Sequence, residues 1–246
     1  MDTIDSRTLG YFDCFFQQFT SAGTVRYSLG VGDAHPGPEG APFTIVVRGE
    51  PGREPAQLDI TVCARNGRLE PDRAEAEIAP GDVVMWHAER SQTPLFSVQG
   101  TGPAGAWGSS SLVSDSIFAH TFGLPGEYRL ANAHDGTLLA VVAVKNPPPF
   151  REPGDHGAWL ASLETGAVIA IESPASRVQR KELRVGQTLV FAIRDVPDPG
   201  ITITDERLLA RYGEDGDPPV EPWEADARLE FGDAASRLRM EEPEDG

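Results

Sequence analysis

The hydrophobic residues of this chain lie in short runs that alternate with polar residues and are separated by Gly and Pro. In residues 57–64, Leu58, Ile60 and Val62 occupy every second position, with polar or small side chains between them. A period of two is typical of a β-strand with one buried face. Comparable runs predict further strands at 83–86, 94–98, 127–131 and 138–144. The pattern therefore predicts an all-β protein.

Strand patterns continue on both sides of this middle segment, at 16–29, 43–48, 166–172, 183–193 and 201–204. The N-terminal runs repeat part of the middle segment. Residues 16–29 parallel 118–130, and residues 43–48 parallel 139–145. A repeated strand pattern indicates a second unit of the same kind.

The clearest boundary in the chain is the run of Pro147, Pro148 and Pro149. Consecutive prolines cannot donate ladder hydrogen bonds and hold a stiff, extended path, as a linker does. A second break lies at 49–55, where Gly, Pro and charged residues replace the alternation. We therefore expect a partial unit at 10–50, a complete domain at 56–146, a linker at 147–154, a second β domain at 155–240 and an acidic tail at 241–246.

The charge of the chain limits its partners. Its 246 residues include 38 acidic and 21 basic ones, which gives a formal net charge of −17. Nucleic acid phosphates would be repelled, so we expect no DNA or RNA partner. No stretch reaches the ~18 apolar residues of a membrane span, and no secretory signal is seen at the N-terminus. We expect a cytoplasmic protein, or part of a particle assembled in the cytoplasm.

Four short motifs of the middle segment follow one another in a characteristic order. They are GDVVMW at 81–86, FAHTF at 118–122, GLPGEYRL at 123–130 and VVAV at 141–144. With these motifs, segment 56–146 resembles the cupredoxins, the family of plastocyanin and azurin. The resemblance implies a Greek-key β-sandwich, and the flanking strands indicate a second sandwich domain.

The residues that bind copper in that family are replaced here. A blue-copper centre needs two imidazoles and a thiolate, with a weak axial ligand. At the matching positions the chain has Leu95 and Asp135 for the two His, and Asn132 for the Cys. Leu138 or Leu139 falls near the axial Met. The resemblance therefore implies the fold, with a degenerate copper site and no bound cofactor.

The N-terminal strands at 10–50 are too few for a sandwich and would leave unpaired edges. Residues 183–193 resemble the opening strands of the same family. We therefore expect 155–240 to complete one sandwich with 10–50, within one chain or between neighbouring chains. The alternative is a C-terminal domain that is complete by itself and ends in a hairpin of 227–231 and 236–240.

The sequence contains no nucleophile elbow, phosphate loop, dinucleotide fingerprint or zinc-protease motif. We therefore expect a non-enzymatic structural subunit that binds a protein partner or self-associates. Phe96 and Trp107 are the candidate interface aromatics, and the alternative is that both belong to the core. The alternative is a metalloprotein that holds copper or zinc, for storage or electron transfer, through a non-standard set of His87, His134 and Asp135.

Overall fold

The computed structural model describes residues 4–34, 41–49, 54–172, 178–196 and 200–209. The chain divides into two units, Met1–Leu209 and Ala210–Gly246. The second unit lies outside the described residues. The expected hairpin at 227–231 and 236–240 and the acidic tail at 241–246 lie there too.

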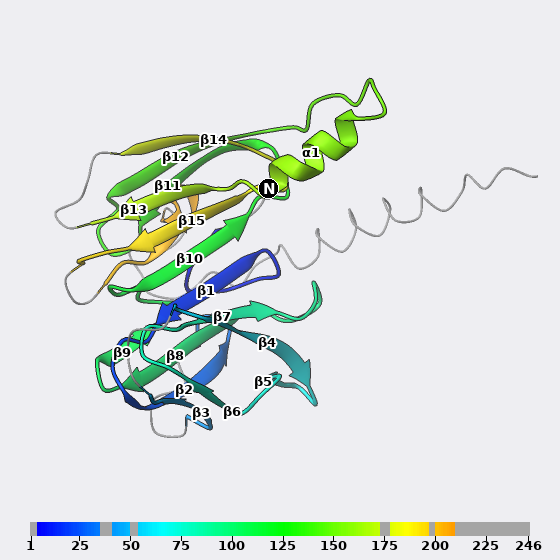
Figure 1. The fold of residues 1–246 in the computed structure, drawn as a ribbon. Coiled ribbons are helices and arrows are strands. Elements are labelled where there is room, and N and C mark those ends of the chain that lie inside the picture. Colours follow the sequence, from blue (N-terminus) through cyan, green and yellow to red (C-terminus); the bar gives the residue numbers. More distant parts are fainter. Residues whose placement is uncertain (1–3, 35–40, 50–53, 173–177, 197–199, 210–246) are drawn as a thin grey trace, which may run out of the picture. The chain divides into compact units, whose positions relative to one another are not determined.

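Three β-sheets make up most of the described structure (Figure 1). The largest has seven strands in the order β13 (Ala167–Ile171), β15 (Thr188–Ile193), β10 (Ser116–Thr121), β1 (Asp13–Gln18), β7 (Val83–Ala88), β4 (Gln57–Arg65) and β5 (Arg68–Pro71). A five-stranded sheet has the order β6 (Glu75–Ile78), β3 (Phe43–Val47), β2 (Gly23–Val31), β8 (Phe96–Gly102) and β9 (Gly105–Gly108). A four-stranded sheet has the order β14 (Gln179–Arg184), β12 (Leu138–Lys145), β11 (Gly126–Asn132) and β16 (Ile203–Asp205). Two helices, α1 (Asp155–Leu163) and α2 (Glu206–Leu209), complete the described elements.

The strand pairing of the first half of the chain recurs in the second half. In the first half, β2 pairs with β3 and β8, and β7 lies between β1 and β4. In the second half, β11 pairs with β12 and β16, and β15 lies between β10 and β13. The parallel pairs correspond as well, because β3–β6 and β4–β7 match β12–β14 and β13–β15. The strands β1 to β9 therefore form a first repeat, and β10 to β16 form a second repeat of the same topology.

Each repeat buries the inner face of its part of the seven-stranded sheet against its own smaller sheet. In the first repeat, the Trp107 ring of β9 stacks on Phe15 of β1 at 6.1 Å, and Tyr27 of β2 meets the edge of Trp86 of β7 at 5.5 Å. The buried apolar side chains of both repeats form one connected core. The alternation read from the sequence sets this burial, since β1 and β7 bury every second residue.

The repeats are joined first by the antiparallel pairing of β1 with β10 in the middle of the seven-stranded sheet. Two shorter contacts join them elsewhere. The N-terminal segment bridges both small sheets, because Asp5 pairs with Thr204 of β16 and Leu9 pairs with Phe96 of β8. The segment after β9 does the same, since Leu112 pairs with Ile201. Residues 4–209 are thus tied together at three places.

The structure confirms the predicted β class, and each predicted strand run within the described residues contains at least one strand. The grouping of the strands differs from the expected one. Segment 56–146 is divided between the repeats, and 10–50 pairs with it rather than with 155–240. The boundary between the repeats lies between β9 and β10, not at 147–154, and α1 occupies the start of 155–240, where no element was predicted. The physical reason is that β1 and β10 are equivalent strands, so their local patterns do not specify which strand each will pair with.

Gly100 of β8 provides a test of the packing in the first repeat. A Cβ at this position would overlap the Trp107 ring, which lies against the bare backbone. We expect Gly100→Ala to lower the free energy of unfolding by about 2 kcal/mol, because the ring must leave its place among Phe15 and Trp86. Gly157→Ala in α1 is the control, since nothing lies within 4 Å of its added Cβ. Urea unfolding measures both, and equal effects would contradict this account.

Candidate functional site

Phe96 and Trp107, the predicted interface aromatics, are core residues. Phe96 is fully buried and Trp107 is 8% exposed. Both point inward from the five-stranded sheet, and Trp107 contacts Phe15, Phe19 and Trp86. The prediction that they are exposed anchors is therefore wrong, because the inward register of β8 and β9 places them between the sheets.

The residues of the predicted alternative metal set lie on separate elements. His87 is on β7, where its Nε2 lies 3.4 Å from Thr61 Oγ1 of β4. His134 and Asp135 lie in the loop between β11 and β12. The Asp135 carboxylate accepts a hydrogen bond from the Thr137 backbone N–H at 2.9 Å, which holds the pKa of Asp135 below its ordinary value. Among the described residues, no group of three His, Cys, Asp or Glu side chains stands close enough together to hold a metal ion.

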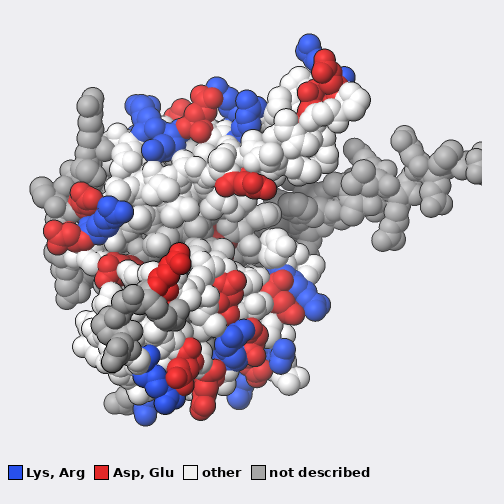
Figure 2. Space-filling view, in the orientation of Figure 1, with Lys and Arg blue, Asp and Glu red and all other residues white. Residues whose placement is uncertain are grey.

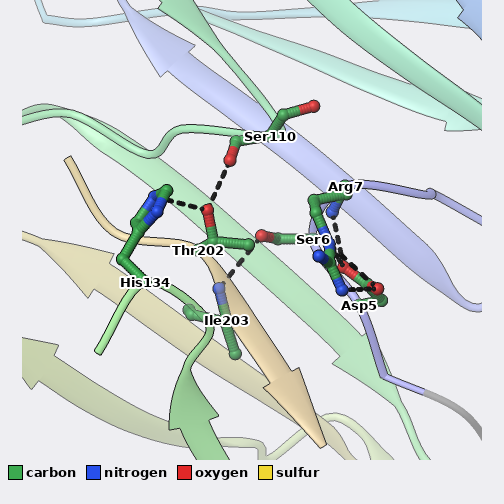
Figure 3. Close-up of polar contacts among 7 residues, drawn as sticks. All are labelled: Asp5, Ser6, Arg7, Ser110, His134, Thr202 and Ile203. Atoms are coloured by element: carbon green, nitrogen blue, oxygen red, sulfur yellow. Dashed lines mark hydrogen bonds and ion pairs between the residues drawn. The ribbon is translucent and has the colours of Figure 1, made fainter. Parts of the chain in front are cut away.

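His134 instead belongs to a polar cluster around Thr202 (Figure 3). The Thr202 hydroxyl donates to the Ser110 carbonyl at 2.6 Å, and His134 Nε2 lies 3.0 Å from the same hydroxyl oxygen. A hydroxyl has one proton, which here goes to the carbonyl, so His134 must donate from Nε2. A histidine that donates to a hydroxyl cannot deprotonate it. The arrangement therefore ties three segments together and does not activate a nucleophile.

The N-terminal segment enters the same cluster through backbone and side-chain bonds. Ser6 N–H donates to the Ile203 carbonyl at 2.8 Å, and Ile203 N–H donates to Ser6 Oγ at 3.1 Å. The buried Asp5 carboxylate is held by Arg7, whose side chain forms an ion pair with it at 2.6 Å (Figure 3). These bonds connect the first residues described to the last strand of the second repeat.

The β1–β10 pairing contains two buried polar pairs. His120 Nδ1 lies 2.7 Å from Asp13 Oδ1, and Ser116 Oγ donates to Gln17 Oε1 at 2.7 Å. The register places Phe15 opposite Phe118 between them. Because β1 and β10 are equivalent strands that run antiparallel, the two polar pairs are counterparts around that aromatic centre. We call this arrangement, with Asp13, Phe15 and Gln17 against Ser116, Phe118 and His120, the seam.

The electrostatics of the seam are dominated by burial. Asp13 is 5% exposed and His120 is 2% exposed. Burial raises the pKa of Asp13 above its ordinary value of 3.8, against the opposing effects of His120 and of the Gly10 N–H that donates to its other oxygen. His120 Nε2 is buried without a hydrogen-bond partner among the described residues and meets the Phe122 ring edge-on. The enclosed pair has no open approach for a substrate.

The opposite side of the seven-stranded sheet carries a different surface. Here the outward positions of five adjacent strands hold no Asp, Glu, Lys or Arg. They are Val168 and Ala170 of β13, Thr188, Val190 and Ala192 of β15, Ile117, Ala119 and Thr121 of β10, Cys14, Phe16 and Gln18 of β1, and Val83, Met85 and His87 of β7. We call these residues the sheet face.

The sheet face remains partly accessible. Val168 is 56% exposed, and all the other members except Ala119 are of intermediate exposure. In the view of Figure 2, most of the surface over β13, β15 and β10 is uncharged, with a few acidic side chains within it and more charged side chains above, below and to the left. Of the two described helices, α2 packs on β11 and β16. The sequence contained a signal for this surface. In β10 and β15, apolar residues occur at successive positions, so the outward side of each strand is apolar as well as the inward side.

No family model, curated protein or solved structure matches this chain. None of the described helices is both long enough and apolar enough to cross a membrane.

Asp13 predicts a specific pH dependence of stability. Its folded pKa is raised, so the folded state binds the proton more tightly than the unfolded state does. Its contribution therefore favours folding most below pH 3.8 and is lost as the pH rises through the folded pKa. Asp13→Asn removes this titration. We expect wild type to lose stability relative to the variant as the pH rises across that window, as measured by urea unfolding at a series of pH values.

The counterpart pair supplies the control for the Asp13 experiment. Gln17→Leu removes the acceptor of the Ser116 hydroxyl without removing a titratable group. We expect a loss of about 1–3 kcal/mol that is the same at every pH. Parallel wild-type and Asp13→Asn profiles would show that Asp13 is not perturbed by the seam.

Thr202 and Thr204 form a matched pair for testing the cluster of Figure 3. Thr202→Val leaves the Ser110 carbonyl and His134 Nε2 without their partner, and we expect it to cost about 1–3 kcal/mol. Thr204 Oγ1 is buried and has no hydrogen-bond partner among the described residues, so Thr204→Val should be neutral or stabilising. Thermal unfolding of both variants measures the difference, and a Thr202→Val variant as stable as Thr204→Val would refute the assignment.

Proposed function

We propose that this chain is a non-enzymatic, cupredoxin-like structural subunit of a protein assembly, and that the sheet face is its contact surface. The partner surface is apolar and carries no charge where it meets the face. The observation that carries the proposal is the absence of charged residues from the outward positions of five adjacent strands.

The cupredoxin resemblance supports the fold assignment within this proposal. Two related motifs lead into equivalent strands of the repeats, because GDVVMW at 81–86 leads into β7 and VGQTL at 185–189 leads into β15. Asn132, at the position of the family's copper-binding Cys, accepts hydrogen bonds from the Thr202 and His134 backbone N–H groups at 3.2 and 3.3 Å. Its amide oxygen therefore has a structural use.

The placement of the polar groups supports a non-enzymatic role. The pairs that resemble catalytic dyads are Asp13 with His120 and His134 with Thr202. The first is buried in the seam, and the second has its proton directed away from the histidine. The first pair connects the two repeats, and the second ties the β11–β12 loop to the segment before β16. Structural connections of this kind are the use expected of buried polar pairs in a rigid subunit.

The sheet face supports the contact role. Charged residues make up 24% of the chain, so a surface of this extent without any is unusual for the protein. Exposed apolar patches with a polar margin mark protein interaction sites. Charged residues are depleted at the centre of protein interfaces, because a charge buried there must be desolvated.

Thiol labelling in the native setting tests this proposal. Val168 on the sheet face and Val31 on β2 are matched, with exposures of 56% and 57%. Each is changed to Cys in a chain that has Cys14→Ala and Cys63→Ala. In fresh extracts of the source cells we expect Val168→Cys to react at least about tenfold more slowly than in dilute purified protein, because the partner covers it. Val31→Cys should react at the same rate in both.

Equal rates for Val168→Cys in the two settings would refute the contact role of the sheet face. Slowing of both sites would indicate general burial in a particle, and would equally contradict a contact confined to this face. Urea unfolding of each variant confirms that the labelled proteins are folded.

A further inference from the structure

We propose that the partner at the sheet face is a second copy of this chain, stacked face to face about a two-fold axis that runs along β10. This inference rests on the proposed function and names its partner. It follows from the charge, the extent and the shape of the face, each of which can be read from the described residues.

Charge limits where two copies can meet. Each chain carries a formal net charge of −17, so two copies repel one another over most of their surfaces. The sheet face adds nothing to that repulsion, because its only titratable side chains are His87 and Cys14, and burial raises the pKa of the Cys14 thiol to about 11. The thiol is therefore neutral, and the face is a place where two acidic copies can approach without apposing carboxylates.

The extent of the face suits a stable homodimer. Five strands spaced about 4.8 Å apart and five residues of about 3.3 Å each cover a flat area of roughly 400 Å², and the accessible area of the side chains on it is larger. A standard interface buries about 800 Å² on each partner. The flat area of the sheet face is thus about half of one such interface, and the relief of its side chains and the strand ends add to it.

The shape of the face is complementary to itself. On one side of β10 the side chains are small or branched, as in Ala170, Val190 and Ala192. On the other side they are long or aromatic, as in Phe16 and Met85. An axis along β10 turns each half onto the other half, so large side chains of one copy lie over small ones of the other. An axis across the strands would instead place Phe16 and Met85 opposite themselves.

The same axis brings Ile117, on the central strand, close to its counterpart in the second copy. β10 is the middle strand of the five, with β13 and β15 on one side and β1 and β7 on the other. Sheets that stack face to face lie about 10 Å apart, a distance that two opposed Ile side chains can fill. A two-fold contact of this type is closed and does not propagate into filaments.

Light scattering on a sizing column tests the proposal with the full-length chain. We expect wild type to have twice the chain mass of 26.5 kDa at the concentrated end of a dilution series and to shift toward the single mass at the dilute end, where the purified protein is labelled. Ile117→Glu and Ile117→Lys should each run at a single chain mass, with the dissociation constant raised at least about 100-fold, because like charges are buried opposite one another. An equimolar mixture of the two variants should recover the double mass, since Glu then faces Lys.

Val31→Glu is the control, because Val31 is 57% exposed on β2 and away from the face. It should keep the double mass. Circular dichroism and urea unfolding of all variants separate loss of the dimer from loss of the fold. Should Ile117→Glu fail to fold, Val168→Glu on the exposed edge strand β13 takes its place, with the expected shift toward a single mass.

Three results would overturn the inference. They are a single mass for wild type, a double mass retained in both Ile117 variants, and a mixture of the folded variants that stays at single mass. A single mass for wild type together with slowed labelling of Val168→Cys in extracts would leave the proposed function standing and identify the partner as a different protein. A single mass without that slowing would remove both.

Discussion

The antiparallel pairing of β1 with β10 is the contact on which the rest of this structure depends. It joins four strands of the first repeat to three strands of the second in one continuous sheet, and it does so between equivalent strands of the two repeats. The seam is uneven in its chemistry: an aromatic pair lies at its centre, with an ionisable pair on one side and an amide–hydroxyl pair on the other. Buried polar pairs of this kind favour one register, because a shift of the strands would leave four buried groups without partners.

Both surfaces of the seven-stranded sheet follow from this pairing. On the inner side, the seam places two buried polar pairs within the one apolar core that the repeats share, on either side of Phe15 and Phe118. On the outer side, the outward residues of β1 and β10 become neighbours, and the uncharged surfaces of the two repeats merge. Neither repeat alone would present five adjacent uncharged strands. The contact surface is therefore a property of the joined molecule.

Much of the fold could be predicted from the sequence, because a period of two is a local property. The alternation of Leu58, Ile60 and Val62 was sufficient to predict strand β4. The likeness of 16–29 to 118–130 correctly indicated a repeated pair of strands. The pairing of strands could not be predicted in the same way. β1 and β10 have equivalent places in their repeats, so local pattern does not specify which of them joins β7 and which joins β15. α1 was missed because none of its residues is buried, and it has no apolar stripe to read.

The candidate sites were harder to predict than the strand pairing, because the side-chain contacts that define them join positions far apart in the sequence. Asp13 and His120 are 107 residues apart, and nothing near either residue indicates the other. His134 was noted as a possible metal ligand, yet its partner Thr202 lies 68 positions away in a segment predicted only as a strand. Phe96 and Trp107 were misplaced because aromatic residues suit both cores and interfaces, and only the register of β8 and β9 separates the two cases.

The long reach of the N-terminal segment also sets the order in which a nascent chain can finish folding. Ser6 bonds to Ile203, which is synthesised 197 residues later. Translation proceeds at about 5–20 residues per second, so Ile203 is made roughly 10–40 s after Ser6. During that interval the first repeat can fold at the ribosome with the outer edge of β1 open, because β10 has not yet arrived or paired. An open strand edge is a template for pairing with another chain, so the arrival of β10 also closes an edge along which two unfinished chains could join.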